Sequence, residues 1–318
     1  MSTIQLHPAR TSSHLPTPQG ALLHHYVNGG YAVDLYNDGT KIRTPLHSSN
    51  PIADWPEQMD LKITDWCDAG CGWCHEESTT AGQHANIERT LQVLTGLHPG
   101  TEIAIGGGDP LSHPMFAEFV QELRIRQLVP SVTINGRHFQ RSLPLLEKLI
   151  AQGNLFGVGV SYFNSTIDWD YPNMVQHVIT GINHPSLFLK SNLTRQKLLL
   201  LGYKTFGRGR QIMSLQPDFI ADNISAWYRA LHLVCQQHQV SFDNLAIEQL
   251  QPRRLFPSSK TYQSLYMGEE GLFSMYVDAV KETFALCSYA EERHPWTSEG
   301  SLLNIRPMFQ TIRTLQHG

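Results

Sequence analysis

Residues 67–74 have the sequence Cys-Asp-Ala-Gly-Cys-Gly-Trp-Cys, and this stretch decides how the whole chain is interpreted. It holds three of the five cysteines of the 318-residue protein. Thiolates are the usual ligands of iron–sulfur clusters, and three of them on one loop can bind three irons of a cubane. Gly70 and Gly72 allow the backbone to wrap closely around such a cluster. The fourth iron would lack a protein ligand, which provides the open coordination position that chemistry requires.

A zinc site is the alternative for the same cysteines. Cys67, Cys71 and Cys74 would form a Cys₃His set with either His75 or His84. However, the adjacent residues Cys74 and His75 are awkward joint ligands of one ion, and zinc modules usually carry two separated pairs of ligands. The spacing therefore favours an iron–sulfur cluster over zinc.

Length and composition predict one large α/β domain with small additions. Apolar residues make up 41% of the chain and charged residues 16%, which is enough for a sizeable core. No apolar stretch approaches the roughly 20 residues of a membrane-spanning helix, and no signal peptide is visible. We therefore expect a soluble, cytoplasmic protein with reduced thiols and no disulfide framework. The net charge of −4 and the scattered basic residues argue against long nucleic acid as a partner.

Short strands and helices alternate along most of the chain, and repeated strand–helix units imply a parallel sheet. The predicted strands are Met59–Thr64, Glu102–Ile105, Ser131–Ile134, Phe156–Ser161, Met174–Thr180, Lys197–Leu201 and Leu245–Glu248. The predicted helices lie over residues 87–95, 116–123, 145–150 and 224–238. Units of this number and size make most of a barrel. We therefore predict the α/β class, with a partial, six-stranded (β/α)₆ barrel of the TIM-like type.

Predicted hairpins flank this barrel on both sides. Tyr31–Tyr36 and Lys41–Arg43 alternate around an Asn-Asp-Gly turn, which is a strong hairpin signal. Gly271–Val277 and Thr283–Leu286 indicate a second hairpin, and the chain up to about Leu22 looks like a loose tail. The predicted division is a tail and β-hairpin over residues 1–56, the barrel over 57–250, and a C-terminal α+β extension over 251–318 that helps to close the site.

Polar and glycine-rich segments follow the predicted strands. The second strand ends in Gly-Gly-Gly-Asp at residues 106–109, where the absence of side chains lets a small polar ligand group approach the backbone. The third strand ends in Asn135, the fourth in Ser161, and a basic, Gly-rich loop containing Lys204 follows the sixth. Each segment alone has an ordinary alternative, either a turn or a solvated surface loop. Because they occur in order at the strand ends where barrels carry their sites, they favour a ligand-binding face.

These motifs together resemble those of the radical S-adenosylmethionine (SAM) superfamily, over about Met59 to Glu248. The Cys-x3-Cys-x2-Cys spacing, with an aromatic residue before the last cysteine, is similar to the signature of that family. The resemblance implies a [4Fe–4S] cluster on Cys67, Cys71 and Cys74, with SAM bound at the open iron. The residues that the resemblance and the strand ends assign to cofactor binding are Trp73, Gly107, Gly108, Asp109, Asn135, Ser161 and Lys204. Asp109 stands where the family usually has Glu, which puts the role of this side chain in doubt.

The resemblance also implies the reaction. One electron, from a donor such as flavodoxin or ferredoxin, breaks the S–C5′ bond of SAM, and the 5′-deoxyadenosyl radical removes a hydrogen atom from the substrate. A peptide or protein substrate is favoured, because the C-terminal extension resembles a version without clusters of those in peptide-modifying members. A nucleoside, nucleotide or small metabolite is the alternative, and a non-enzymatic iron–sulfur or zinc protein is the alternative of another class. Only Cys235 and Cys287 lie outside the loop, so we expect no auxiliary cluster.

Overall fold

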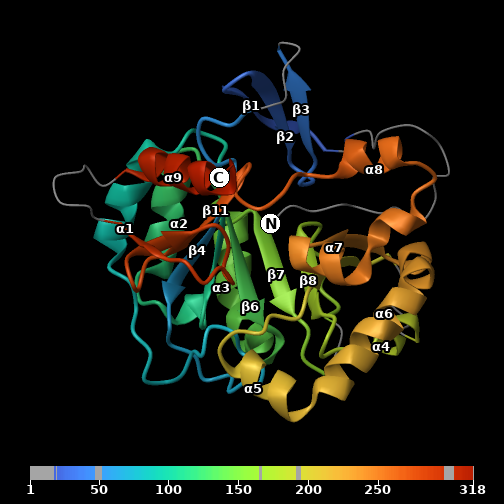
Figure 1. Cartoon of the computed structure of the whole chain (residues 1–318). Coiled ribbons are helices and arrows are strands. Elements are labelled where there is room, and N and C mark those ends of the chain that lie inside the picture. Colours follow the sequence, from blue (N-terminus) through green and yellow to red (C-terminus); the bar gives the residue numbers. More distant parts are fainter. Residues whose placement is uncertain are drawn as a thin grey trace.

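The computed structural model describes residues 18, 20–46, 52–164, 167–190, 195–296 and 304–317. The described strands form a sheet of three strands and a sheet of ten. Figure 1 shows the small sheet at one end of the large one, with helices along the outside of the large sheet. The predicted loose tail lies outside the described residues over residues 1–17.

Seven parallel strands form the body of the large sheet, in the order β10-β9-β8-β7-β6-β5-β4. They are β4 (Gln58–Thr64), β5 (Glu102–Gly107), β6 (Val129–Asn135), β7 (Gly157–Ser161), β8 (Met174–Ile179), β9 (Lys197–Leu201) and β10 (Gln239–Phe242). Beyond β4, the strand β11 (Ser274–Asp278) is also parallel, and β12 (Thr283–Ala285) and β13 (His294–Pro295) follow in antiparallel pairing. This order is that of an open, partial barrel, which confirms the predicted α/β class, although the parallel strands outnumber the predicted six.

Helices join these strands and cover the outer side of the barrel (Figure 1). They are α1 (Ile87–Val93), η1 (Leu94–Gly96), η2 (Pro110–Ser112), α2 (Phe116–Ile125), η3 (Gly136–His138), α3 (Phe139–Ala151), α4 (Ser186–Leu189), α5 (Arg208–Leu215), α6 (Pro217–Gln237), α7 (Asn244–Leu250), η4 (Pro252–Leu255), α8 (Ser259–Leu265) and α9 (Ile305–His317). Ile103 and Ile105 of β5 pack in a common core with Phe119 of α2. Because alternate residues of a strand face opposite sides, Ala104 and Gly106 face the barrel interior. Among the described helices, none has the length and apolar character needed to cross a membrane.

The small sheet is fixed to the N-terminal ends of the barrel strands. Its strands β1 (Leu22–Asn28), β2 (Tyr31–Tyr36) and β3 (Lys41–Pro45) pair antiparallel, which confirms the predicted hairpin. Glu57, which directly precedes β4, is completely buried beneath this sheet. Tyr31 donates a hydrogen bond to Glu57 at 2.5 Å, and Arg43 Nε donates to the same carboxylate at 2.9 Å.

The seventh predicted strand is wrong. Residues 245–248 lie in α7, because the side chain of Asp243 accepts a hydrogen bond from the Ala246 backbone at 2.7 Å and begins a helix there. The strand beside β9 is instead β10, which the sequence analysis missed. Its residues Gln239–Phe242 follow the long helix α6 after a single residue, with no turn signal between the two elements.

Candidate active site

The cysteine loop is part of a long segment between β4 and α1 that folds back on itself. The Asp65 backbone N–H donates to the Gln83 carbonyl at 2.8 Å, and the Cys67 N–H donates to the Thr79 carbonyl at 2.9 Å. Cys67, Cys71 and Cys74 are free thiols, and each is half-buried. The loop therefore holds its three thiols at the C-terminal end of the barrel strands, where barrels carry their sites.

Two of the sulfur atoms accept hydrogen bonds. The Ala69 backbone N–H donates to Cys67 Sγ at 3.4 Å, and Asn135 Nδ2 donates to Cys71 Sγ at 3.2 Å. Burial raises the pKa of both the Cys67 and the Cys71 thiol above the usual value. Coordination of a metal is the ordinary way to hold such buried thiols as thiolates, because the positive charge compensates for the lost hydration.

The spacing of the three sulfur atoms does not suit a single metal ion. A single metal ion needs several ligand atoms close together. Among the described residues, ligand atoms within 4.8 Å of one another are found on Asp68, Asp109 and His138. None of the three thiols belongs to this group. One tetrahedral zinc ion, with Zn–S bonds of about 2.3 Å, would need sulfur atoms roughly 3.8 Å apart. A cubane binds each thiolate at a different iron, so it accommodates wider separations. The donor set therefore fits an iron–sulfur cluster.

The two histidines of the alternative zinc set have other partners. His84 Nδ1 lies 2.8 Å from the Thr64 hydroxyl, and His75 Nε2 lies 3.3 Å from the Glu76 carboxylate. Burial alone would raise the pKa of Glu76, but its contacts with His75 and with Lys62 lower this pKa below its usual range.

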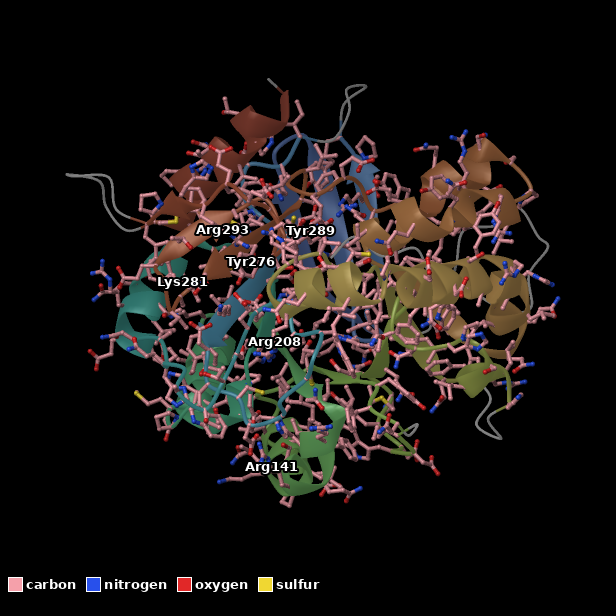
Figure 2. The ribbon with its side chains drawn as sticks, turned by 60° about the horizontal axis from the view of Figure 1, so that its bottom comes forward. Arg141, Arg208, Tyr276, Lys281, Tyr289 and Arg293 are labelled. Atoms are coloured by element: carbon pink, nitrogen blue, oxygen red, sulfur yellow. The ribbon has the colours of Figure 1, made fainter. Side chains whose placement is uncertain are left out.

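Two arginines bind the backbone carbonyls of the cysteine loop. Arg208 Nε donates to the Cys71 carbonyl at 2.9 Å, and Arg137 Nη1 donates to the Ala69 carbonyl at 2.5 Å. Figure 2 labels Arg208, the first residue of α5, on the end of the barrel that this view turns toward the viewer. These contacts come from two different elements, so the loop is fixed from both sides.

The glycine-rich end of β5 lies directly against the start of the cysteine loop. A Cβ atom on Gly107 would come within 2.4 Å of the Thr64 carbonyl oxygen, and one on Gly108 within 2.1 Å of the Trp66 carbonyl oxygen. A Cβ atom on Gly106 would meet nothing within 4 Å. Gly107 and Gly108 are therefore required for close packing of backbone on backbone, whereas Gly106 borders open space in the barrel interior.

Asp109 is almost completely buried and has its two carboxylate oxygens in different settings. Its Oδ2 atom accepts a hydrogen bond from Arg141 Nη2 at 2.7 Å and lies 3.3 Å from His138 Nδ1. Its Oδ1 atom is buried without a hydrogen-bond partner. A buried acceptor without a donor is unfavourable, so only one of the two carboxylate oxygens is stabilised by these contacts.

An aromatic pair borders the loop on the side of β7. The Trp73 ring stacks on the Phe163 ring, with centroids 6.5 Å apart and planes inclined by 22°. The Arg137 guanidinium lies over the other aromatic ring, 3.8 Å from the Phe163 centroid. Ser161 ends β7 in register with Asn135 on β6. The structure therefore brings Ser161 and Asn135 together at neighbouring strand ends, and Trp73 contacts Phe163 two residues beyond Ser161.

A search with family models supplies the classification. The model of the radical SAM superfamily matches residues 61–184, from β4 to the turn after β8. The match covers less than half of the chain and identifies this stretch as similar to the radical SAM superfamily. Enzymes of this superfamily use a [4Fe–4S] cluster and SAM, and they need an electron donor. A search of curated proteins found no match to the chain.

Several solved structures are similar to this chain, and three of them are of SuiB from Streptococcus suis. SuiB bound to S-adenosylmethionine has a TM-score of 0.47 and 9% identity, covering 77% of this chain and 64% of that one. SuiB bound to the precursor peptide SuiA has a TM-score of 0.45 and 10% identity, covering 74% and 60%. SuiB described alone has a TM-score of 0.50 and 9% identity, covering 87% and 85%. The chain thus spans less than two thirds of the first two structures, and the third likeness shows the fold alone.

Lys204 connects the strand ends of the barrel to the C-terminal segment. Its Nζ atom donates to the Ser288 hydroxyl at 2.8 Å and lies 3.5 Å from His75 Nε2. It also lies 5.5 Å from the centroid of the Tyr289 ring. Burial, assisted by the charge of Lys204, lowers the pKa of His177 to about 4, so this interior histidine is neutral at physiological pH.

Lys62 is a site residue that the sequence analysis missed. It is 2% exposed on β4, and its Nζ atom contacts Asp65 at 2.5 Å, Glu76 at 2.7 Å and Asp278 at 3.3 Å. Asp65 and Glu76 lie on either side of the cysteines, and Asp278 lies in β11, so Lys62 joins both ends of the loop to the C-terminal extension. A lysine within an apolar strand was the signal that could have identified it.

The remaining cysteines lie outside this group. Burial raises the pKa of Cys235 to about 12 and that of Cys287 to about 11, so both are protonated thiols at neutral pH.

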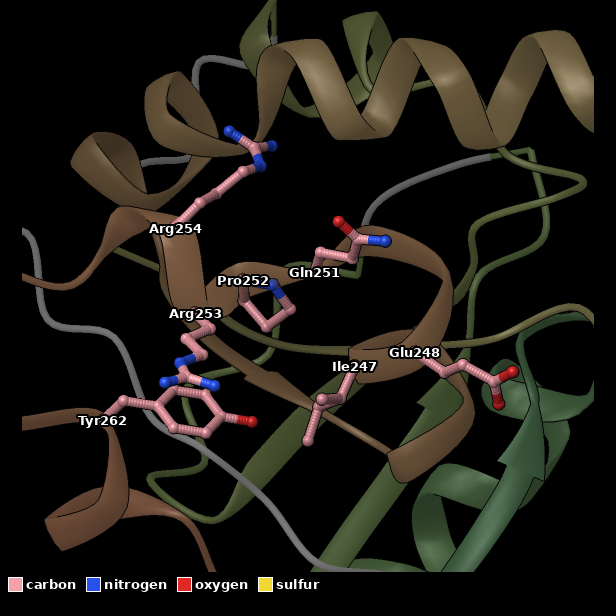
Figure 3. Close-up of a pocket in the computed structure, with 7 residues that line it drawn as sticks. All are labelled: Ile247, Glu248, Gln251, Pro252, Arg253, Arg254 and Tyr262. Atoms are coloured by element: carbon pink, nitrogen blue, oxygen red, sulfur yellow. The ribbon is translucent and has the colours of Figure 1, made fainter. Parts of the chain in front are cut away.

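A cavity of about 560 Å³ lies between α7, η4 and α8, and none of the predicted site residues lines it (Figure 3). It is lined by Ile247, Glu248, Gln251, Pro252, Arg253, Arg254 and Tyr262.

Proposed function

We propose that this chain is a radical SAM enzyme whose [4Fe–4S] cluster is held by Cys67, Cys71 and Cys74. The observation that carries the proposal is the set of three half-buried thiols on one loop, too widely spaced for one ion, at the C-terminal end of a parallel barrel. When bound and reduced, the cluster supplies the electron that cleaves SAM to methionine and a 5′-deoxyadenosyl radical, which abstracts a hydrogen atom from the substrate. Flavodoxin or ferredoxin is the proposed class of electron donor.

The SAM molecule is proposed to lie against the end of β5. Gly106 leaves open space there, and Asp109 at the end of the same segment is proposed to accept a hydrogen bond from the amino group of SAM. Trp73, stacked on Phe163, offers an apolar surface for the adenine ring. Ser161 and Lys204 are proposed to bind hydroxyl or carboxylate oxygens of SAM, because Ser161 ends β7, Lys204 follows β9, and both can donate hydrogen bonds.

Asn135, Gly107 and Gly108 were predicted to bind the cofactor directly, and their contacts suggest supporting roles instead. Asn135 donates to Cys71 Sγ and accepts from the Arg137 backbone N–H at 3.0 Å, so its proposed role is to support the cluster loop. Gly107 and Gly108 pack against the backbone of residues 64–66, so their proposed role is to place the end of β5 next to that loop.

The proposed substrate is a peptide or protein. The basis is the resemblance of the C-terminal extension to that of peptide-modifying members, together with the position of this extension. Ser288 binds Lys204, and Arg293 lies over the Tyr276 ring at 4.6 Å from its centroid. Tyr276, Tyr289 and Arg293 are labelled in Figure 2 on the end that carries the cysteine loop. Tyr276 is buried, whereas Tyr289 and Arg293 are partly exposed, and aromatic and arginine side chains are common anchors for peptide chains.

Production of 5′-deoxyadenosine tests this function. Protein reconstituted without oxygen, then supplied with dithionite and SAM, is expected to form 5′-deoxyadenosine and methionine in equal amounts, slowly without substrate. Product formation is measured by chromatography. A variant with Cys67, Cys71 and Cys74 all replaced by Ala is the control, and it should form neither product. Intact SAM in the presence of a cluster shown by EPR to be reduced would disprove the proposal, as would stoichiometric zinc in protein that refuses iron.

A further inference from the structure

The cavity between α7, η4 and α8 lies outside the site described so far, and two arginines line it (Figure 3). Its volume of about 560 Å³ is within the range of roughly 300–1,000 Å³ that is usual for ligand pockets. Both arginines, Arg253 and Arg254, are exposed residues of η4. Within the described part of the chain their partners are neutral. Arg253 donates to the Ser259 hydroxyl at 2.8 Å, and Arg254 donates to the Tyr228 carbonyl and lies 3.8 Å from the centroid of the Tyr228 ring.

The walls of the cavity are held in place by packing and by backbone geometry. Tyr262 of α8 is only 7% exposed, and its ring lies 5.4 Å from that of Phe256 and 5.6 Å from that of Tyr266, between centroids. Gln251 has a φ angle of +48°, in the left-handed region, where α7 ends and the chain turns sharply into η4. The directions from which the two arginines approach the cavity are therefore set before any ligand binds, which lowers the entropic cost of binding.

The charges around the cavity are separated into two sides. Glu248 of α7 also lines the cavity, and Figure 3 shows its carboxylate pointing away from the guanidinium groups of Arg253 and Arg254. A guanidinium has five N–H donors in a planar arrangement, and each of these two has donors left beyond its neutral partner. Carboxylates and phosphates fit such donors in pairs. The arginine side of the cavity therefore favours an anionic group.

Helix α7 connects this cavity to the strand ends that carry the site. Asp243, which caps the helix, accepts from the Gly202 backbone N–H at 2.9 Å, and Gln249 accepts from the Tyr203 N–H at 2.9 Å. The helix has seven residues and is about 10 Å long, and its last turn lines the cavity. The preceding strand, β10, is at the open edge of the ten-stranded sheet. An extended peptide advances about 3.3 Å per residue, so roughly three to five residues span the length of α7.

We propose that this cavity binds an acidic side chain of the peptide substrate, a few residues away from the residue that reacts at the cluster. The inference rests on the proposed peptide substrate, and it does not depend on how SAM is bound. It adds a chemical requirement to that substrate, which must carry an Asp or Glu residue. The carboxylate would pair with Arg253 and Arg254, and the apolar side chains of Ile247 and Pro252 would border its methylene groups.

The first test compares three model peptides on the reconstituted protein. They are hexapeptides of Ala and Gly with two Glu, two Gln or two Lys residues, blocked at both termini and carrying the same neutral coumarin label. Binding is measured by fluorescence anisotropy. The Glu peptide should bind at least about tenfold more tightly than the Gln and Lys peptides, and this preference should decrease as salt is added, because exposed charges are screened.

The second test uses variants of the cavity. Arg253→Gln combined with Arg254→Gln should bind the Glu peptide about tenfold more weakly than the wild type does, and combined replacement with Lys should have a smaller effect, since Lys keeps the charge but not the planar donors. Glu248→Gln should bind the Glu peptide at least as tightly as the wild type does. Arg229→Gln is the matched control. Arg229 is also exposed and donates to the neutral Ser225 hydroxyl at 2.7 Å, but it is not among the described residues that line the cavity.

Several results would overturn the proposal. They are equal affinity for the Glu and Gln peptides, binding of none of the three, and the same loss in Arg229→Gln as in the double Gln variant. Tighter binding of inorganic phosphate than of the Glu peptide would also overturn it, because the cavity would then be a site for a free anion. SAM cleavage without substrate should be unchanged in all of these variants. Failure of the wild type to cleave SAM would instead disprove the proposed function, while the peptide measurements would still decide this proposal.

Discussion

The two ends of the barrel use buried charge in opposite ways. At the N-terminal end, Glu57 is completely buried, and both of its oxygens have partners. Arg43 Nε lies 2.9 Å and 3.1 Å from them, and Lys41 lies 3.5 Å away and also bridges to Glu102 at 2.5 Å. At this end the charges are neutralised by fixed protein groups, two of which, Lys41 and Arg43, come from β3 of the small sheet.

At the C-terminal end, buried groups are left incomplete. Three thiols are half-buried and free, and the Oδ1 atom of Asp109 has no partner. The Gly106 position borders open space. The surrounding residues are nevertheless held in place, since Arg208 and Arg137 bind the loop carbonyls. The difference shows that one end stabilises the fold, and that the other is a rigid frame with positions that a ligand can complete.

The strongest test of this contrast is removal of the three loop cysteines. Replacing Cys67, Cys71 and Cys74 together with Ala should lower the iron content from about four per chain to none. The apo protein should unfold at nearly the same urea concentration as the wild type, because the thiols are half-buried on a loop and fill no core. Iron is measured by colorimetric assay and unfolding by circular dichroism.

The matched control for that experiment is replacement of Cys235 and Cys287 together with Ala, which should keep all four irons. These two cysteines are the only ones outside the loop. A residual cubane signal in the EPR spectrum of the reduced triple variant would show that they bind an auxiliary cluster, contrary to our expectation.

At the N-terminal end, we expect a mutation to lower the stability and to leave the iron content unchanged. Glu57→Gln removes the carboxylate that neutralises Arg43 and Lys41, and breaking a buried ion pair costs about 3–5 kcal/mol of unfolding free energy. Urea denaturation of the apo protein measures the loss. The folded fraction of the variant should still take up about four irons, because no atom of this group contacts the cysteine loop.

Glu122→Gln is the control for Glu57→Gln. Glu122 pairs with Arg126 on the outer side of α2 and is 37% exposed, so its loss should cost about 0–1 kcal/mol. A loss below about 1 kcal/mol in Glu57→Gln would mean that the two ends do not differ in the way described.

Local patterns predicted most of the fold. Lys197–Leu201 has the bounds of β9, because a continuous apolar run specifies a strand buried on both faces. The Asn-Asp-Gly turn identified the first hairpin in the same way. The error at residues 245–248 arose because the capping carboxylate of Asp243 determines that helix, while the apolar residues alone suit either element.

The candidate site could be predicted only where its residues are close in sequence. The cysteine spacing and the glycine-rich strand end are local signals. The contacts of Arg141 with Asp68 and Asp109 span 73 and 32 residues, and Lys62 reaches Asp278 in the C-terminal extension. Such contacts depend on which strand ends meet in space. For the same reason, the sequence could not show that Gly107 and Gly108 face backbone whereas Gly106 faces open space.

The difference between Gly106 and Gly108 gives the most specific test of the C-terminal end. Gly108→Ala should lower the unfolding free energy by about 1–3 kcal/mol, because its Cβ atom would meet the Trp66 carbonyl oxygen at 2.1 Å and overpacking must displace the loop. Gly106→Ala should change stability by less than about 1 kcal/mol and keep the cluster, since its Cβ atom meets nothing within 4 Å. The added methyl group would narrow the space proposed for SAM, so its affinity for SAM should fall by about tenfold. Unfolding curves and equilibrium dialysis of both variants measure these effects side by side. Wild-type SAM affinity in Gly106→Ala would show that the ligand lies elsewhere, and the open space beside β5 would then have no part in the site.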